Sequence, residues 1–282
     1  MMEPTRGGAY LGEMVRYCKE ELDIASVTVV SNGSKVPGLA WSPVTGVQVT
    51  EGWMREFGYY LDILAVSCDS FDSEVTSNFN LKQHLIFLHL LLLNLLLLHL
   101  LPHLQVNDRI GRRGAGGGAA HLASLARVRA WCDTFGVLFK LNTVVNSHNW
   151  AEDMVAQVAA LRPVRWKVFQ CLAIGAENQG EGALRQVEEF LVTEEQWGAF
   201  LSRHSSLAAL VPESNEAMRN SYLILDEYMR FLDNSGGAKA ASCSLLDVGV
   251  AAAMDRAGFD QAMFLRRGGK YRWSKHDHKL DW

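Results

Sequence analysis

The sequence predicts an α/β fold built on a parallel sheet, either a full or a partial βα barrel. Strand-like and helix-like segments alternate in units of about 25–35 residues, as expected for parallel strands joined by crossover helices. Two of the strand-like segments, residues 137–145 and 163–172, are apolar enough to be buried. With 282 residues and 49% apolar content, the chain can bury a full core as one large domain or two small ones.

The amino-terminal part contributes two strand–helix units to this prediction. Apolar residues recur with helical spacing over residues 10–22, which predicts a helix. A β-branched run over 26–30 predicts a strand that ends in the turn signal Ser31-Asn32-Gly33. A short helix is expected over 53–60 and a buried strand over 61–67.

The remaining elements follow the same alternation. In order, they are a helix over 122–135, a strand over 137–145, a helix over 151–161, a strand over 165–172, a helix over 194–204, a short strand over 207–211 and a final helix over 244–257. Residues 222–232 fit either a helical or a strand period. Ligands of such folds bind at the carboxyl ends of the strands, where Ser31, Ser67 and the segment 146–149 fall.

Two of the predicted strands carry cations in an alternating pattern. Successive strand residues point to opposite faces, so Lys140 and Asn142 share one face, as do Arg165 and Lys167. The alternate residues, which should pack outward against helices, are Phe139, Leu141, Trp166 and Val168. Buried cations are costly unless an anion compensates them. A bound polyphosphate would do so, and the alternative is a structural ion-pair network with Asp or Glu side chains.

Bulk composition excludes several classes of protein. The net charge of -4 gives no general basic surface for nucleic acid or anionic membranes. The nearest two of the five cysteines, Cys132 and Cys171, are 39 positions apart, so no pair has metal-knuckle or redox-motif spacing. The odd cysteine count favours a reduced cytosolic setting over a disulfide scaffold. His276 and His278 could bind a metal together, but two ligands are weak evidence for a metal site.

Two segments do not fit the alternation and are interpreted as insertions, 35–50 and 78–118. The second contains an almost pure leucine run, whose 17 residues 85–101 reach the lower limit for a membrane helix. A transmembrane span and an amphipathic anchor are therefore alternatives to a disordered, translated non-coding insertion. The Gly-rich stretch 111–118 follows no strand and is too irregular for a dinucleotide fingerprint.

The cation-bearing strands and their flanking words resemble the viperin family, which are interferon-inducible radical S-adenosylmethionine enzymes of vertebrates. The matching words are FKLNTVVN, EDMVAQ, LRPVRWKVFQCL, AEN, LVPESN, SYLILDEYMRFL, LLDVGV, RRGGKYRW and a terminal LDW. The resemblance is nearly continuous over 131–282 and resumes in the blocks 10–34 and 52–75. The two insertions lie between these blocks.

The resemblance implies a partial radical-SAM barrel over 1–268 and a tail, 269–282, that closes over a nucleotide. It implies S-adenosylmethionine and a [4Fe–4S] cluster as cofactors, and the conversion of CTP to 3′-deoxy-3′,4′-didehydro-CTP in antiviral defence. It also implies that the full-length protein lies on the cytosolic face of the endoplasmic reticulum and on lipid droplets, held there peripherally by an amphipathic helix.

The resemblance also assigns roles to individual residues. The residues that it places on the triphosphate are Lys140, Arg165, Lys167, Arg112, Lys270 and Arg272. It places Glu3, Ser31, Asn32 and Ser67 on S-adenosylmethionine, and makes Tyr222 a catalytic residue near the ribose. The terminal Trp282 would recruit cytosolic iron–sulfur assembly proteins. From the residues alone, Tyr222 could be a core aromatic, Ser31 and Asn32 a simple turn, and the tail a frayed terminus.

The sequence departs from the family at the cluster. Radical-SAM enzymes ligate the cluster through a Cys-x3-Cys-x2-Cys loop, and no cysteines here have that spacing. Counted against the family, the chain begins inside a Gly-Gly-Glu-Pro motif, with Glu3-Pro4 remaining. The first strands and the membrane helix would then be absent, and an inactive chain is expected. A non-catalytic scaffold that keeps nucleotide and partner binding is the rival hypothesis.

Overall fold

The computed structural model describes most of the chain outside a few segments. The described residues are 7–31, 49–71, 117–174, 178–179, 186–233, 235, 240–267, 269, 272–274 and 279–281. They form two compact units. The first unit comprises residues 1–143, 151–166 and 204–210, and the second comprises 144–150, 167–203 and 211–282.

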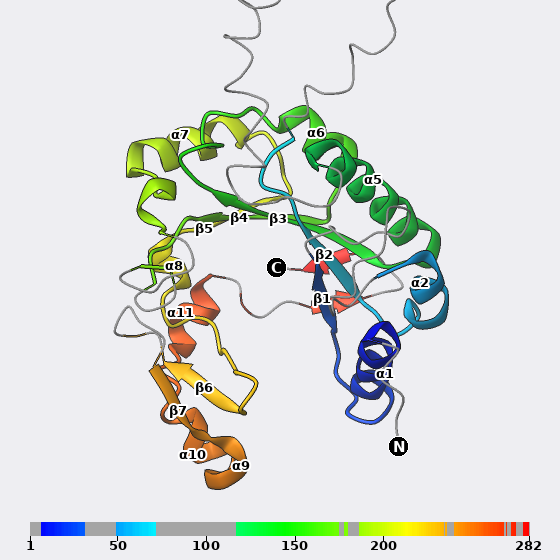
Figure 1. The fold of residues 1–282 in the computed structure, drawn as a ribbon, viewed down its shortest axis with the longest axis vertical. Helices are drawn as coiled ribbons and strands as arrows, with labels where there is room; N and C mark the ends of the chain where they lie inside the picture. Colours follow the sequence, from blue (N-terminus) through cyan, green and yellow to red (C-terminus); the bar gives the residue numbers. More distant parts are fainter. Residues whose placement is uncertain are drawn as a thin grey trace, which may run out of the picture. The chain divides into compact units, whose positions relative to one another are not determined.

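A five-stranded parallel sheet with the strand order β1-β2-β3-β4-β5 is the central element, so the predicted α/β class and partial barrel are confirmed. Its strands are β1 (Thr28–Ser31), β2 (Ile63–Ser67), β3 (Leu138–Val145), β4 (Arg165–Gln170) and β5 (Leu210–Glu213). Strand order follows chain order, as expected when each strand is followed by a crossover to its neighbour (Figure 1). In the register of the first three strands, Val30 pairs with Ala65 and Ala65 pairs with Lys140.

The described helices of the first unit are α1 (Gly7–Glu20), α2 (Glu51–Phe57), α5 (Gly117–Phe135) and α6 (Val155–Leu161). Among them, α1 precedes β1 and the others each come between two strands of the sheet. Thr50 begins α2 by accepting a hydrogen bond from the Trp53 N–H through its hydroxyl. Gly136, with φ 63°, ends α5 in the left-handed conformation that glycine adopts without strain.

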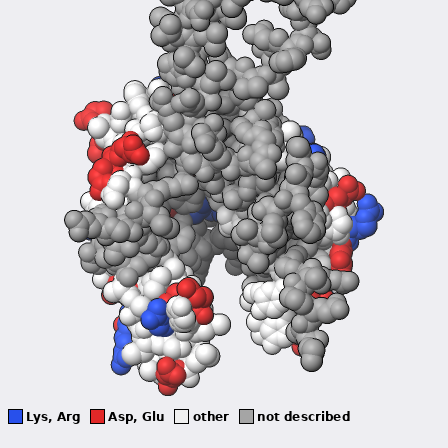
Figure 2. All heavy atoms as spheres, viewed as in Figure 1, with Lys and Arg blue, Asp and Glu red and all other residues white. Residues whose placement is uncertain are grey.

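The second unit adds helices and two antiparallel hairpins. Its helices are α7 (Glu194–His204), α8 (Asn215–Met218), α9 (Leu245–Val248), α10 (Val250–Met254) and α11 (Gln261–Arg266), with a 3-10 turn, η2 (Glu188–Phe190). One hairpin pairs β6 (Arg230–Asp233) with β7 (Ala240–Ser244), and the other pairs β8 (Arg272–Ser274) with β9 (Lys279–Asp281). Acidic side chains gather over α7 (Figure 2), whose first turn carries Glu194 and Glu195.

Three sequence predictions differ from the structure. The helix expected over 151–161 begins at Val155, after a turn. The helix expected over 244–257 is two short helices, because Gly249 lies between them with φ 78° and ψ 161°, outside helical geometry. It is also not the final helix, since α11 follows it. The segment 222–232, which fitted either a helical or a strand period, overlaps the strand β6 at its carboxyl end.

The two predicted insertions fall largely outside the described residues. Within the described residues at their edges, Thr50 caps α2 and Gly117 begins α5, and the extent of both insertions stays a prediction. The leucine run 85–101 lies wholly outside the described part of the chain. In that described part, no helix is both long enough and apolar enough to cross a membrane.

A buried ion pair joins α1 to the start of β2. The Lys19 ammonium donates to Asp62 Oδ2 at 3.1 Å and to the carbonyls of Ile24 and Ala25 at 3.0 Å. Asp62 Oδ2 also accepts from the Val27 N–H at 2.7 Å, and only 2% of the Asp62 side chain is exposed. One carboxylate therefore fixes the end of α1 and the entrance to β1 against β2.

We expect Asp62→Asn to lower the free energy of unfolding by about 1–3 kcal/mol, because a buried donor loses its charged acceptor. Denaturant unfolding measures this change. The control is Glu13→Gln, which removes an exposed pairing partner of Arg16 and should cost less than about 1 kcal/mol. Equal effects of the two substitutions would show that the Asp62 pair does not hold the first unit together.

Candidate functional site

The predicted cations lie on strands whose two faces differ in burial. Along β3, Phe139 and Leu141 are buried, whereas Lys140 and Asn142 are partly exposed. The guanidinium of Arg129, on α5, lies 5.5 Å from the Phe139 ring centroid. The helix therefore covers the apolar face of β3, which confirms that Lys140 and Asn142 share the opposite face.

Strand β4 buries its cations more deeply than β3 does. Arg165 is 6% exposed and Lys167 is 7% exposed. Trp166 and Val168 on the other face are fully buried, as predicted. Lys140 and Arg165 belong to the first unit and Lys167 to the second.

The Lys167 ammonium forms an ion pair with Oε1 of Glu213, the last residue of β5. It also donates a hydrogen bond to the Tyr222 hydroxyl at 2.9 Å. Glu213 is only 1% exposed, so the pair is sheltered from water. The sequence analysis left a structural ion pair and a ligand site open for this cation, and the carboxylate that the structural interpretation requires is present.

A second cation, Arg267, shares the same carboxylate oxygen. Its Nη1 lies 3.5 Å from Glu213 Oε1, and its Nη2 donates to the Ser221 carbonyl at 2.7 Å. The guanidinium lies 4.1 Å from the Tyr222 ring centroid, a cation–π contact. We call Lys167, Glu213, Tyr222 and Arg267 the buried cation cluster, and the formal charges of its three ionic members sum to +1.

Sequence reasoning missed Glu213 and Arg267 as members of this cluster. Both lie far along the chain from Lys167, and only the folded arrangement of β5 and the end of α11 brings them to it. The one available signal was a carboxylate directly after a short apolar strand, in the word LVPESN.

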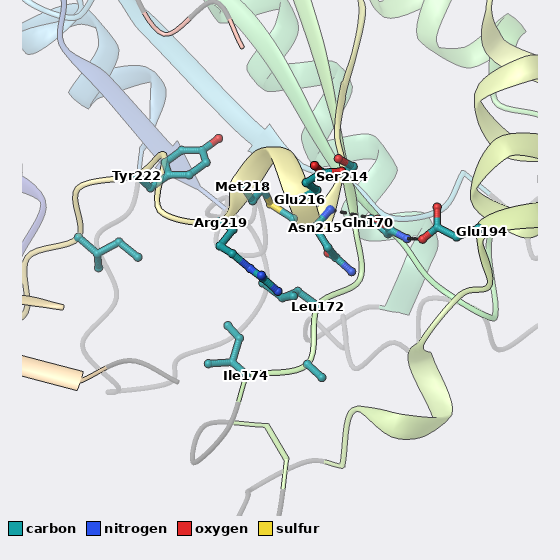
Figure 3. Close-up of a pocket in the computed structure, with 12 residues that line it drawn as sticks. Gln170, Leu172, Ile174, Glu194, Ser214, Asn215, Glu216, Met218, Arg219 and Tyr222 are labelled. Carbon is teal, nitrogen blue, oxygen red and sulfur yellow. Dashed lines mark hydrogen bonds between the residues drawn. The ribbon is translucent and has the colours of Figure 1, made fainter. Parts of the chain in front are cut away.

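A cavity of about 730 Å³ opens at the carboxyl ends of β4 and β5, and Tyr222 lines it. Its apolar lining includes Leu172, Ile174 and Met218, and its polar lining includes Arg219 (Figure 3). Tyr222 thus belongs both to the cavity wall and to the buried cation cluster. This position agrees with the expectation that ligands bind where parallel strands end.

The polar side of the cavity is an ordered network of side chains. Gln170 donates to Glu194 Oε1 at 2.8 Å and accepts from the Asn215 N–H at 3.0 Å (Figure 3). Asn215 in turn donates from Nδ2 to the Cys171 carbonyl at 3.3 Å. Its Oδ1 is buried and has no hydrogen-bond partner within the described portion of the structure. A ligand with an N–H or O–H donor would satisfy this acceptor.

The first unit has a comparable acceptor where the last residue of β2 pairs with β3. Ser67 pairs with Asn142 in the sheet register, so their side chains leave on the same face. Asn142 Oδ1 is buried and has no hydrogen-bond partner among the residues described. Ser31 pairs with Val66, one position before Ser67, so its side chain leaves on the other face. A ligand with an N–H or O–H donor would satisfy the Asn142 acceptor.

Several predicted site residues fall where the structure gives no side chain. Glu3, Asn32, Arg112, Lys270 and Trp282 lie outside the described residues. The backbone of Arg272 lies in β8, with no side-chain description. Their roles remain predictions.

The described residues do not fit an iron–sulfur cluster. The cysteines lie on separate elements, and no group of three His, Cys, Asp or Glu side chains that could hold a metal occurs within the described ranges. Burial raises the pKa of the Cys132 thiol to about 12, which makes the thiolate needed for ligation unfavourable.

Comparison with known proteins gives long matches to one group of relatives. The chain is 48% identical over 275 residues to S-adenosylmethionine-dependent nucleotide dehydratase RSAD2 of Danio rerio, covering 98% of this chain and 64% of the relative. The same-named protein of Oncorhynchus mykiss is 47% identical, with 66% of its length covered. An S-adenosylmethionine-dependent nucleotide dehydratase of the bacterium Lacinutrix mariniflava is 29% identical over 251 residues, 89% of this chain and 42% of the relative. No family model matches the chain.

We expect Cys243 to react with iodoacetamide at pH 8 in the folded protein and Cys132 to resist it. Cys243 is exposed, whereas the pKa of about 12 keeps buried Cys132 protonated far above neutral pH. Peptide mass spectrometry locates the label. Denaturation is the control, because it should equalise the two rates. Rapid labelling of native Cys132 would contradict the burial described here.

Proposed function

Because the chain belongs to the viperin (RSAD2) family of S-adenosylmethionine-dependent nucleotide dehydratases, we propose that it serves the dehydration of a nucleoside triphosphate, with CTP as substrate. The product would be 3′-deoxy-3′,4′-didehydro-CTP, made in antiviral defence. The chain spans about two thirds of the length of its fish relatives, so the activity of the whole protein is part of this proposal.

The observation that carries the proposal is the hydrogen bond of 2.9 Å from Lys167 to Tyr222. It links a buried group of cations to a residue that lines the cavity at the strand ends. A triphosphate needs fixed positive charge, and the ribose beside it needs a water-excluding wall. Lys167 supports the first requirement and Tyr222 the second. We assign Tyr222 as the catalytic residue near the ribose.

We propose that the triphosphate is bound by Lys167 and Arg267, the two cations that meet at Glu213 in the second unit. Lys140 and Arg165, in the first unit, remain predicted contacts of the triphosphate. The predicted contributions of Arg112, Lys270 and Arg272 complete the set. A guanidinium group can donate two parallel hydrogen bonds to one phosphate, so Arg267 is well suited to this role.

We propose that S-adenosylmethionine binds at the ends of β1 and β2, with Ser67 as its best-supported contact. The unsatisfied Asn142 Oδ1 beside Ser67 supports this assignment, and Glu3, Ser31 and Asn32 are its further predicted contacts. In the family this cofactor works with a [4Fe–4S] cluster, for which the present sequence has no Cys-x3-Cys-x2-Cys loop. The described residues contribute binding and shelter from water.

The proposed cellular setting follows the family. We propose the cytosolic face of the endoplasmic reticulum and lipid droplets, with iron–sulfur assembly proteins as partners through Trp282. A second candidate function is a non-catalytic scaffold that binds nucleotide. The absence of a Cys-x3-Cys-x2-Cys spacing from the sequence favours it for a protein of these 282 residues.

Nucleotide binding is tested by titration calorimetry with CTP. We expect Lys167→Met and Arg267→Met each to weaken CTP binding at least tenfold, about 1.4 kcal/mol, because each removes one cation from the proposed phosphate site. The matched control is Arg266→Met, which removes an exposed neighbouring guanidinium on α11 and should leave affinity within about twofold.

The outcome separates the proposals. No heat with the unsubstituted protein at millimolar CTP would reject both nucleotide-binding functions. Equal losses for Arg266→Met and Arg267→Met would indicate general electrostatic attraction instead of a built site.

We expect a protein of these 282 residues, treated with iron and sulfide under anaerobic conditions, to show no iron–sulfur absorbance and to form no 5′-deoxyadenosine from S-adenosylmethionine. Three suitably spaced thiolates are missing from the sequence, so a cluster cannot be ligated. Visible absorption and liquid chromatography measure the two results. Formation of 5′-deoxyadenosine would overturn the scaffold proposal and establish catalysis.

A further inference from the structure

Glu213 occupies the centre of the buried cation cluster. Its Oε1 faces both the Lys167 ammonium and the Arg267 guanidinium. Its Oε2 is buried and has no hydrogen-bond partner within the described structure. With 1% of its side chain exposed, Glu213 interacts with these two cations instead of water.

The charge on Lys167 depends on this arrangement. An ammonium group in a low-dielectric site prefers to lose its proton unless a nearby anion stabilises it. The Lys167 side chain is 8% exposed, so water gives it little stabilisation. The positive charge of Arg267 next to it opposes protonation further, and an arginine cannot release its own proton instead.

The groups that face Lys167 come from several elements. They include Glu213 at the end of β5, Arg267 after α11, and Tyr222 after α8. The Phe169 ring on its own strand lies 5.7 Å from the ammonium, and Arg165 is the other cation of that strand. Among these groups Glu213 is the carboxylate, so the anionic stabilisation that they provide comes from it.

We propose that Glu213 is a positioning residue that keeps Lys167 charged and aligns it with Arg267 against Tyr222. This inference rests on the proposed triphosphate site, because a neutral lysine there would not bind phosphate. Glu213 itself would act through the two cations, without touching the nucleotide. The cluster would thus be preorganised before ligand arrives, which lowers the cost of ordering two long side chains on binding.

Whether Glu213→Gln strengthens or weakens phosphate binding distinguishes this proposal from a simple sum of charges. Glu213→Gln removes a negative charge near an anion site, so charge counting alone predicts tighter binding of phosphate. If Glu213 keeps Lys167 protonated, the variant instead loses the lysine charge and the alignment. Phosphate binding by the variant is then weaker at neutral pH and becomes tighter again as the pH is lowered.

The first experiment needs no ligand. Melting temperatures are measured at pH 6 and pH 9 for four proteins. They are the wild type, Glu213→Gln, Lys167→Met and the double variant Glu213→Gln/Lys167→Met. In Glu213→Gln the folded state holds the Lys167 proton more weakly than the unfolded state, so stability rises with pH. We expect the melting temperature of Glu213→Gln to lie below that of the wild type, and this difference to be about 2–4 °C smaller at pH 9 than at pH 6. Between Lys167→Met and the double variant, we expect a difference that does not change with pH.

A difference that is independent of pH in both pairs of proteins would overturn the proposal. If Glu213→Gln does not fold, two double variants are compared, in which either Lys167→Met or Arg267→Met is added to it. Recovery of folding with Lys167→Met would support an uncompensated Lys167 charge as the cause, since replacing a whole buried pair is often tolerated. Recovery with Arg267→Met but not with Lys167→Met would assign the cost to Arg267 and overturn the proposal.

The second experiment uses inorganic triphosphate as the probe in calorimetry. We expect Glu213→Gln to bind it about tenfold more weakly than the wild type at pH 7, with the difference shrinking toward pH 6. Tighter binding by Glu213→Gln across this range would overturn the proposal. Absence of binding by the wild type would reject the proposed triphosphate site, while the unfolding experiment would still report on Glu213 and Lys167.

Discussion

The second unit depends on one electrostatic requirement, the compensation of two buried cations by one carboxylate. Lys167 and Arg267 have little access to water, and Glu213 holds both through one oxygen. Four elements must therefore meet at the same point, namely β4, β5, the segment after α8 and the end of α11. The contacts of Tyr222 with both cations follow from this meeting. The packing around the proposed site is thus set by charge as much as by apolar burial.

The local part of this arrangement was predictable from the sequence. Alternation along β3 separates Lys140 and Asn142 from the apolar residues between them, because side-chain direction in a strand is fixed by the pleat. The strand order could be predicted because each crossover returns to a neighbouring parallel strand. The partnership of Glu213 with Lys167 and Arg267 could not, since it joins positions that no local period relates.

The helix errors have a similar physical cause. The apolar spacing of residues 244–257 continues smoothly, yet a single glycine interrupts the helix. Gly249 adopts φ 78° without steric cost, so the chain can turn there while the apolar residues on both sides still reach one core. That small core contains Phe231, Ala253 and Ala257. Periodicity reports which residues are buried, and it does not report where the backbone changes direction.

The two units present different polar groups to a ligand. In the first unit, Asn142 Oδ1 is a buried acceptor that lacks a donor among the described residues. A ligand with an N–H or O–H donor would satisfy an acceptor of this kind. In the second unit, Lys167 and Arg267 present donors and positive charge, which suit anionic oxygens. Because Lys140 lies on the same face of β3 as Asn142, the first unit also carries a cation, and the two surroundings differ in their buried acceptor and not in the sign of their charge.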